Sequence, residues 1–366
     1  MGVFPSLYSD VSIVTFDDMK HILRTHSEIS EKQEGGQRIH QSFPLGISKN
    51  LINYPIDVSI DSFFNIHSAV LGNSGSGKSN TIAHIIQEIH KKNEYSSIGS
   101  RLLIFDVNGE YKNAFEVGKN SEISVKFFKP NLEAASDSYD PFHLPHFLMS
   151  LDEWSAFLLA TDATQRPFWD KVLQESYRFY RIGTSGEKEK EKFVNYLRHR
   201  ICTLIFSTLR QADSDTARIT TAASILGSIT SIIKSNPGLQ GSSSDLLTDI
   251  ESLQKACAIA YGDNRGELNK ATEVIAKKVD ESKFQEVVSS KIKSGEFFDY
   301  KFLKVAAELI LLEEDARGNK QIRGYTATMM TRLDYFLDNP DCLFMRNADV
   351  IKSSEAFFKQ LWSELS

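Results

Sequence analysis

The residues with the clearest chemical meaning lie in one short stretch, LGNSGSGKSN, from Leu71 to Asn80. Gly72 and Gly77 allow a backbone to curl with its amides pointing inward, and a helix that follows adds its positive end. In such a loop the Lys78 ammonium bridges the β- and γ-phosphates of a nucleotide, and the Ser79 hydroxyl binds magnesium. The spacing G-x-x-x-x-G-K-S therefore predicts a phosphate-binding loop. Its expected contact residues are Gly72, Asn73, Ser74, Gly75, Ser76, Gly77, Lys78, Ser79 and Asn80.

A second stretch, LLIFDVNGEY, runs from Leu102 to Tyr111 and places acids after an apolar run. One interpretation is a strand whose terminal Asp106 orders the shell of a magnesium ion, with Glu110 polarising the attacking water. The other is a buried strand that leaves through an Asp-x-x-Gly turn, with Glu110 exposed. The stretch by itself favours neither. On the first interpretation, Lys78, Asp106 and Glu110 are the expected catalytic residues.

The surrounding sequence predicts the elements that must position these groups. Residues 66–72, IHSAVLG, form a short apolar run that ends at glycine and indicates a buried strand before the loop. After Ser79, the isoleucines at 82, 85, 86 and 89 share one helical face. Residues 102–106 and 123–128 are two further expected strands. Strand, loop, helix and strand make a βαβ unit, the start of a doubly wound parallel sheet.

The N-terminal region mixes short β-like runs with turn signals. YPIDVSI, residues 54–60, alternates apolar and polar side chains and predicts a half-buried strand. SEKQEGGQR, residues 30–38, is polar and rich in turn formers, and we expect it to be a loop.

From about residue 150 the pattern becomes helical. Ser150 and Glu153 are spaced as a capping box, in which the serine accepts the Glu153 amide and the glutamate reaches back. LILLEED, residues 309–315, resembles the acid-terminated strand of an ATPase, with Arg317 placed like an arginine finger. Because the apolar residues before it recur at helical spacing, we interpret it as the end of a helix. Helical patterns cover residues 168–181, 193–209, 219–235, 245–261 and 302–316.

Composition limits the class of protein. The 366 residues are 41% hydrophobic and 25% charged, which is typical of a soluble globular protein. We find neither a secretory signal nor an apolar run of about 18 residues that would span a bilayer. The three cysteines are far apart, so we expect unpaired thiols in a reducing cytoplasm.

The charge pattern restricts how nucleic acid would be bound. A formal net charge of −6 argues against a surface that attracts nucleic acid everywhere, but a ring can still present basic residues inside a pore. Arg198, His199 and Arg200 form one small basic cluster. It either faces such a pore or lies on a surface helix, and the surface position is favoured.

The two motifs together resemble those of a known family. HSAVLGNSGSGKSNT leading into a helix, followed by LLIFDVNGEY, is similar to the HerA-type ATPases of the HerA/FtsK superfamily. In that family a similar loop precedes a strand that ends Asp-x-x-Gly-Glu-Tyr. Weaker likeness continues in FLMSLDEWSAFLLATDATQRPF and in TRLDYFLDNPDCLF, so the resemblance covers about residues 4–346.

The resemblance implies a fold of the α/β class. We expect a P-loop NTPase with a RecA/FtsK-like parallel sheet core, a large helical insertion and a short N-terminal β segment. The corresponding parts are a partial barrel-like segment at 1–62, the first half of the ATPase core at 63–149, the helical insertion at 150–345, and a return towards the core at 346–366.

The resemblance also assigns roles to residues. It places Gly72, Gly77, Lys78, Ser79 and Asn80 at the phosphates, with Asp106 and Glu110 beside them. It identifies the strand of Asp106 as the one after the loop helix, because the family's Walker B strand, typically ending Glu-Glu-Ala-His, follows the helical insertion. An arginine that reaches the neighbouring subunit comes after that strand. The sequence stops before both, so we expect a piece of a longer ATPase in which nucleotide binding survives better than hydrolysis.

Members of the family are hexameric ring ATPases that move duplex DNA through a central pore, often with a nuclease partner. Relatives in anti-phage systems associate with sirtuin-like or nuclease effectors. The resemblance thus implies ATP and Mg²⁺ as cofactors, a homo-hexamer, duplex DNA and an effector protein as partners, a cytoplasmic location and no membrane role.

Two functions compete on this basis. The first is an ATP-dependent DNA translocase or helicase subunit in DNA processing or antiviral defence. The alternative is an ATP-sensing ring scaffold that activates or restrains an effector, a sirtuin-like NADase or a nuclease, without translocating DNA. A GTPase or a small-molecule kinase is less favoured, because the sequence has no Asn-Lys-x-Asp guanine motif.

Overall fold

The protein divides into two compact units, residues 1–127 and residues 128–366, and each is described by itself. The predicted boundaries at residues 62, 149 and 345 stay predictions. The computed structural model describes residues 10, 13–15, 17–19, 31–34, 37–40, 42–49, 53–64, 67–91, 101–115, 124–183, 189–211, 215–235, 244–259, 265–293, 295–319, 321–346 and 352–364.

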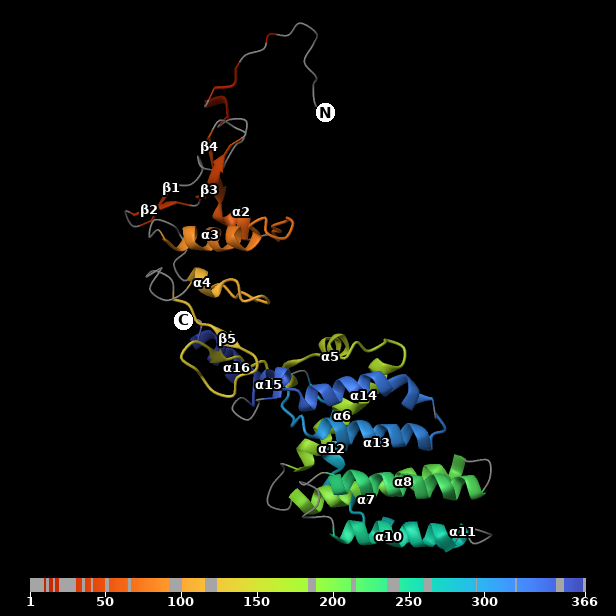
Figure 1. Cartoon of the computed structure of the whole chain (residues 1–366). Coiled ribbons are helices and arrows are strands. Elements are labelled where there is room, and N and C mark those ends of the chain that lie inside the picture. Colours follow the sequence, from red (N-terminus) through yellow and green to blue (C-terminus); the bar gives the residue numbers. More distant parts are fainter. Residues whose placement is uncertain are drawn as a thin grey trace. The chain divides into compact units, whose positions relative to one another are not determined.

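The regular structure described in the first unit includes two antiparallel hairpins and the helices α2, α3 and α4 (Figure 1). The half-buried strand expected at 54–60 is confirmed by β4, which pairs with β3. The loop expected at 30–38 was wrong, because β1 and β2 pair there, with Glu34 opposite Gln37. The Gly-Gly dipeptide between them is a strong signal for a two-residue hairpin turn. The elements are β1 (Glu31–Glu34), β2 (Gln37–His40), β3 (Ser42–Ser48), β4 (Tyr54–Ser59), α2 (Ile60–Phe64), α3 (Lys78–Lys91) and α4 (Lys112–Phe115).

Helix α3, which follows the phosphate-binding loop, buries apolar side chains against two neighbours. Ile85 and Ile89 pack against Phe43 of β3. Ile86 packs against Phe115 of α4. The predicted isoleucine face is therefore real, and it is divided between the β3–β4 hairpin and the segment that contains α4. Burial on both sides fixes the rotation of the helix and with it the direction of its first turn.

The strands predicted on either side of α3 are not confirmed. Within the described residues, 67–72 and 102–106 belong to no sheet. Leu71 is 90% exposed and Phe105 is 77% exposed, although both lie in runs that a buried strand would explain. A strand is held by hydrogen bonds to a neighbouring strand, and these two segments lack one among the described residues. Of the third predicted strand, 123–128, the structure describes residues 124–128, and of these only Phe128 lies in a strand.

The second unit begins with a minimal parallel pair, β5 with β6, and then becomes helical. Helix α13 confirms that LILLEED is the end of a helix. Helices α11 and α14 add to the five predicted from spacing. The elements are β5 (Phe128–Lys129), β6 (Asp140–Pro141), η2 (His146–Leu148), α5 (Leu151–Phe157), α6 (Gln165–Gly183), α7 (Glu189–Gln211), α8 (Asp215–Ser235), α10 (Ser244–Ile259), α11 (Arg265–Ala276), η3 (Glu281–Lys283), α12 (Gln285–Ser289), α13 (Phe302–Ala316), α14 (Ile322–Asp338), η4 (Pro340–Cys342), α15 (Leu343–Arg346) and α16 (Ser354–Glu364).

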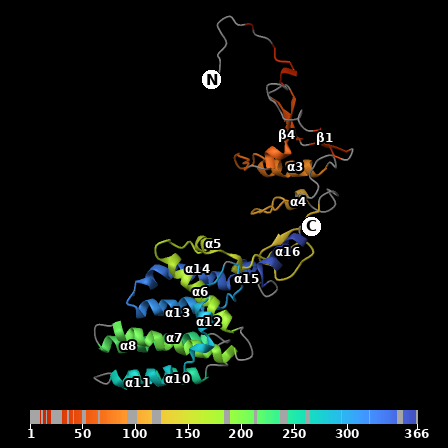
Figure 2. The ribbon, with the colours of Figure 1, turned by 180° about the vertical axis from the view of Figure 1, so that it is seen from behind.

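The long helices of the second unit are stacked in layers (Figures 1 and 2). Helices α10 and α11 pack on α7 and α8, which in turn pack on α13, with α6 and α14 beside α13. Where α5, α6 and α14 meet, the core contains the large aromatic side chains of Trp154, Trp169 and Phe336, all of them buried. Helix α5 opens with the predicted capping box: Ser150 accepts the Glu153 amide, and Glu153 accepts the Ser150 amide at 2.7 Å.

A buried ionic network joins α6, α7 and α13. The fully buried Glu175 carboxylate accepts the Tyr196 hydroxyl at 2.5 Å and lies 3.2 Å from the Arg178 guanidinium. Arg200 lies 3.4 Å from Glu175 and 2.9 Å from Glu313. Burial alone lowers the pKa of Arg200, and Glu175, Tyr196 and Glu313 together more than offset it, so the pKa lies above its ordinary value.

This network changes the interpretation of the predicted basic cluster. Arg200 is an internal ion-pair partner, and Arg198 is largely buried against Asp249 at 2.9 Å. His199 lies 3.5 Å from Glu281, and burial lowers its pKa. Neither a pore position nor a plain surface position describes the two arginines, because both are engaged in holding helices together.

One described helix is long and apolar enough to cross a membrane by length and composition alone. It is α8, over Thr216–Lys234. Its side chains Ile225, Leu226, Ile229 and Ile233 are buried, and they lie in the hydrophobic core of the helical unit. A core helix meets the same criteria.

Candidate functional site

The predicted phosphate-binding loop has a curled backbone that depends on glycine. Gly75 and Gly77 have φ values of +79° and +89°, a region that other residues rarely adopt. A Cβ atom on Gly72 would collide with the Ser76 side chain. The Ser76 amide donates to the Asn73 carbonyl at 3.2 Å and closes the turn. The backbone therefore requires glycine at positions 75 and 77, whereas a side chain at position 72 would displace the Ser76 hydroxyl.

Helix α3 begins directly at the end of this loop and places the two reactive side chains. Lys78 and Ser79 are its first residues. The Lys78 ammonium turns back across the loop and donates to the Asn73 carbonyl at 2.8 Å. Asn80 lies exposed in the same first turn. An ammonium and the start of a helix thus converge on one loop, which is the arrangement that binds phosphate.

The acidic segment after residue 105 is a tight turn. The Asp106 carboxylate accepts the Glu110 amide through one oxygen and the Tyr111 amide through the other, both at 3.0 Å. Gly109 has a φ of +71°, which lets the chain reverse there. The Asp-x-x-Gly turn is therefore present, and Glu110 is exposed as that interpretation requires.

The turn nevertheless brings Glu110 to the phosphate-binding loop. The Ser79 hydroxyl donates a hydrogen bond to the Glu110 carboxylate, although the two residues are 31 positions apart. Of the predicted site residues, the structure thus brings Glu110 to Ser79, next to Lys78 on α3, whereas Asp106 contacts the backbone of its own turn. The turn of the second interpretation is therefore present, whereas the strand of the first is absent among the described residues and its roles for Asp106 and Glu110 stay predictions.

Residues that the sequence did not single out hold the two segments together. Gln87, on α3, donates to the Ala114 carbonyl at 2.8 Å. Tyr111 packs into the cluster formed by Ile86 and Phe115. A glutamine in a helix gives no sign of a partner 27 positions away, so no local signal could have found this contact.

The donor set fits magnesium and a nucleotide triphosphate. Magnesium prefers oxygen ligands and usually binds through one or two protein groups together with phosphates and water. The Ser79 hydroxyl supplies such an oxygen, and the Glu110 carboxylate accepts its proton. The Lys78 ammonium and the glycine-rich backbone are suited to the phosphates. Lys78, Ser79 and the glycine-rich loop would therefore hold magnesium and the triphosphate at the start of α3.

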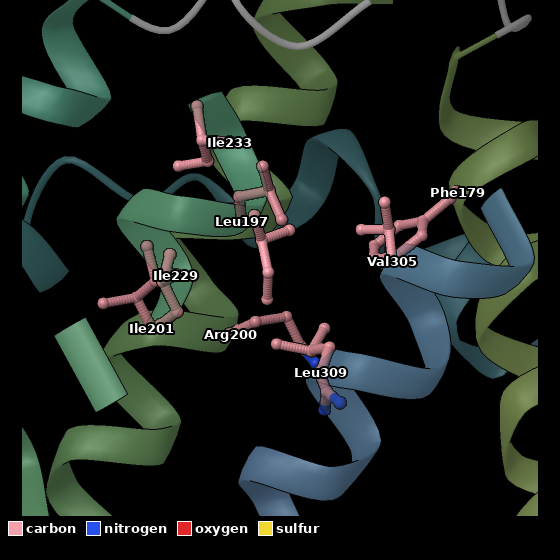
Figure 3. A pocket seen from close by; sticks show the side chains of 9 residues that line it. Phe179, Leu197, Arg200, Ile201, Ile229, Ile233, Val305 and Leu309 are labelled. Carbon is pink, nitrogen blue, oxygen red and sulfur yellow. The ribbon is translucent and has the colours of Figure 1, made fainter. Parts of the chain in front are cut away.

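Two cavities in the helical unit do not compete with this loop as a nucleotide site. The first, lined by Phe179, Leu197, Arg200, Val305 and Leu309 among others, has a volume of about 20 Å³ (Figure 3). That is room for about one water molecule. The second, of about 370 Å³, is a hollow beside Arg181, Lys192 and Lys283, without a glycine-rich loop.

Comparison with known proteins matches a family over the part of the chain that contains the loop and the acidic turn. A search of curated proteins finds no match. The family described as "Helicase HerA, central domain" matches residues 46–337, well over half of the chain. The matched span contains the phosphate-binding loop, the acidic turn and most of the helical unit. The match implies a P-loop NTPase fold. The chain therefore belongs to the HerA central-domain family and is an ATPase of the HerA/FtsK type.

Proposed function

We propose that this protein is the ATP-binding subunit of a hexameric, HerA-like DNA translocase or helicase that works with a nuclease or another effector in DNA processing or antiviral defence. The observation that carries the proposal is the contact between Ser79 and Glu110 at the base of a glycine-rich loop, within a chain of the HerA family. Resemblance to the family supports the ring, the DNA and the effector.

Each residue of the site has a proposed task. The loop from Gly72 to Gly77 surrounds the phosphates with backbone amides. The Lys78 ammonium exchanges its hydrogen bond to the Asn73 carbonyl for contacts with the β- and γ-phosphates. Ser79 binds magnesium, which draws charge from the γ-phosphate when bound. Glu110 orients the attacking water on the same side.

Movement of DNA requires that hydrolysis in one subunit be sensed by the next. A ring places a nucleotide between subunits, so an arginine from a neighbour can stabilise charge in the transition state; loss of such a group costs about 10³-fold or more in rate. We therefore expect hydrolysis to depend on assembly as well as on Lys78 and Glu110.

Three measurements test the proposal: phosphate release from MgATP, binding of MgATP by calorimetry, and binding of duplex DNA. Phosphate release is measured with and without DNA, and DNA binding at several salt concentrations. We expect Lys78→Ala to abolish ATP binding, whereas Lys49→Ala, which removes an exposed lysine from the same unit, leaves it unchanged. DNA binding that is stimulated by ATP and weakened by salt supports translocation.

Two results contradict parts of the proposal. If calorimetry on the folded protein shows no heat with MgATP, the nucleotide site is not there. If ATP binds and the protein captures an effector tightly but has no affinity for DNA at any salt concentration, the ring is a scaffold and the translocase proposal fails.

A further inference from the structure

Both carboxylate oxygens of Asp106 are engaged by the backbone of the acidic turn. One accepts the Glu110 amide and the other the Tyr111 amide, each at 3.0 Å. Hydrogen bonds to an ionised carboxylate are stronger than those between neutral groups, so the pair holds the turn firmly. This geometry aims Asp106 at its own backbone, although the sequence suggested a place for it in the magnesium shell.

The turn is held at its other end by α3. The Tyr111 side chain packs against the face of α3 that carries Ile86. Further along, Gln87 binds the Ala114 carbonyl at 2.8 Å. Glu110 therefore sits between two anchors, the Asp106 carboxylate before it and the α3 contacts after it. From that place its carboxylate receives the hydrogen bond of the Ser79 hydroxyl.

The direction of this hydrogen bond has a chemical consequence. A serine hydroxyl has one proton and two lone pairs. When the proton points to Glu110, the lone pairs are left for a cation. An anionic acceptor also makes the serine oxygen a better ligand, as outer-shell carboxylates do at other metal sites. Magnesium demands near-octahedral geometry and takes few protein ligands, so the direction of this single hydroxyl matters.

We propose that Asp106 is a positioning residue that acts through Glu110: it sets the turn from which the Glu110 carboxylate orients the Ser79 hydroxyl towards magnesium. This inference rests on the proposed ATP site and divides the work among its residues. Ser79 is the direct ligand, Glu110 orients the Ser79 hydroxyl, and Asp106 positions Glu110.

The test measures how nucleotide binding by the full chain depends on magnesium. Binding of a fluorescent ATP analogue is titrated with MgCl₂, and also in excess EDTA. In Asp106→Asn, an amide NH₂ replaces one acceptor and faces a backbone N–H, so the turn loosens. We expect Asp106→Asn and Glu110→Gln each to raise the half-saturating Mg²⁺ concentration about tenfold or more, the usual cost of losing an outer-shell partner. Binding in EDTA stays within about twofold, because the phosphate contacts of the loop remain.

Double variants show whether the residues act in series. If Asp106 acts through Glu110, the Asp106→Asn/Glu110→Gln double variant needs no more Mg²⁺ than Glu110→Gln alone. In a Ser79→Ala background, Asp106→Asn causes no further change. Effects that add, or a further loss in the Ser79→Ala background, would mean that Asp106 meets the metal directly and would overturn the proposal.

Two controls separate this result from misfolding and from failure of the site itself. Asn108→Ala alters an exposed side chain of the same turn and should leave the Mg²⁺ dependence unchanged. Thermal melts check each variant, and Glu110→Gln, which keeps the shape of the side chain, decides the matter if Asp106→Asn unfolds. If Lys78→Ala binds the analogue as well as the unaltered protein does, the proposed ATP site fails. If Lys78→Ala does abolish binding but Glu110→Gln shows the same Mg²⁺ dependence as the unaltered protein, the ATP site stands and the inference about Asp106 and Glu110 fails.

Discussion

The side-chain amide of Gln87 donates a hydrogen bond to the backbone carbonyl of Ala114 at 2.8 Å, and so ties the helix of the phosphate-binding loop to the segment of the acidic turn. The contact lies on the half-buried side of α3, beside the apolar cluster of Ile86 and Phe115. Together with the Ser79–Glu110 hydrogen bond, it is a polar contact between α3 and a segment that also packs through apolar side chains. Its loss should therefore affect both the stability of the first unit and the placement of Glu110.

Replacing Gln87 by leucine should test this tie. The Ala114 carbonyl loses this donor while the bulk of the side chain is kept, so we expect a loss of about 0.5–1.5 kcal/mol in the free energy of unfolding. Binding of MgATP should weaken as well, because Glu110 is less well placed. Urea unfolding and calorimetry measure the two effects. His84→Leu, at an exposed position of the same helix, serves as the control, and an equal loss there would contradict the prediction.

The ion network of the helical unit predicts a large difference between two arginines that pair with Glu313. Arg200→Met leaves the fully buried Glu175 without one of its cations, and we expect a loss of about 3–5 kcal/mol. Arg317→Met removes a half-exposed pair with the same glutamate, which should cost about 0–1 kcal/mol. Urea unfolding followed by far-UV circular dichroism gives both values. Equal losses would show that burial does not decide the difference.

His146 should make the helical unit less stable at mildly acidic pH. Its ring nitrogens lie 2.8 Å from the Phe298 carbonyl and 3.1 Å from the Met345 carbonyl. Burial lowers its pKa below the ordinary 6.5, against the smaller opposing effects of those two hydrogen bonds and of Asp299. The unfolded chain therefore binds more protons just below pH 6.5, so stability is lost as the pH falls through that range.

The variant His146→Gln should lose that part of the pH dependence. Its unfolding free energy at pH 7.5 will be lower, but the further drop between about pH 6.5 and 5 should be smaller than in the unaltered protein. His67→Gln, at an exposed position, should keep the full drop. A drop that is unchanged in His146→Gln would assign the pH dependence to other groups.

The cysteines should react slowly with thiol reagents. Cys202, Cys257 and Cys342 are all buried free thiols, and burial raises the pKa of Cys202 and of Cys257 to about 11. Little thiolate is then present at pH 8, and access is blocked as well. We expect slow reaction with a disulfide reagent in native protein and rapid reaction of all three thiols in urea. Rapid reaction of Cys202 without urea would show that its surroundings open readily.

Local features of this protein were determined by the sequence itself. The glycines of the loop, the Ser150–Glu153 capping box and the helices α6, α7, α8, α10 and α13 were predicted because each depends on residues within a few positions of one another. The loop spacing also predicted which side chains carry the chemistry, and the loop lies within the span that the family model matches.

Pairings across long stretches of chain were decided only by the tertiary structure. Three such contacts depend on how the elements pack, and the residues next to them in the sequence do not predict them. They join Ser79 with Glu110, Gln87 with Ala114, and Arg200 with Glu175. The apolar runs at 66–72 and 102–106 predicted strands that the described residues do not form. An apolar run determines that a segment is suited to a strand, but a strand forms only where another segment supplies its hydrogen bonds, and that partner is a property of the whole fold.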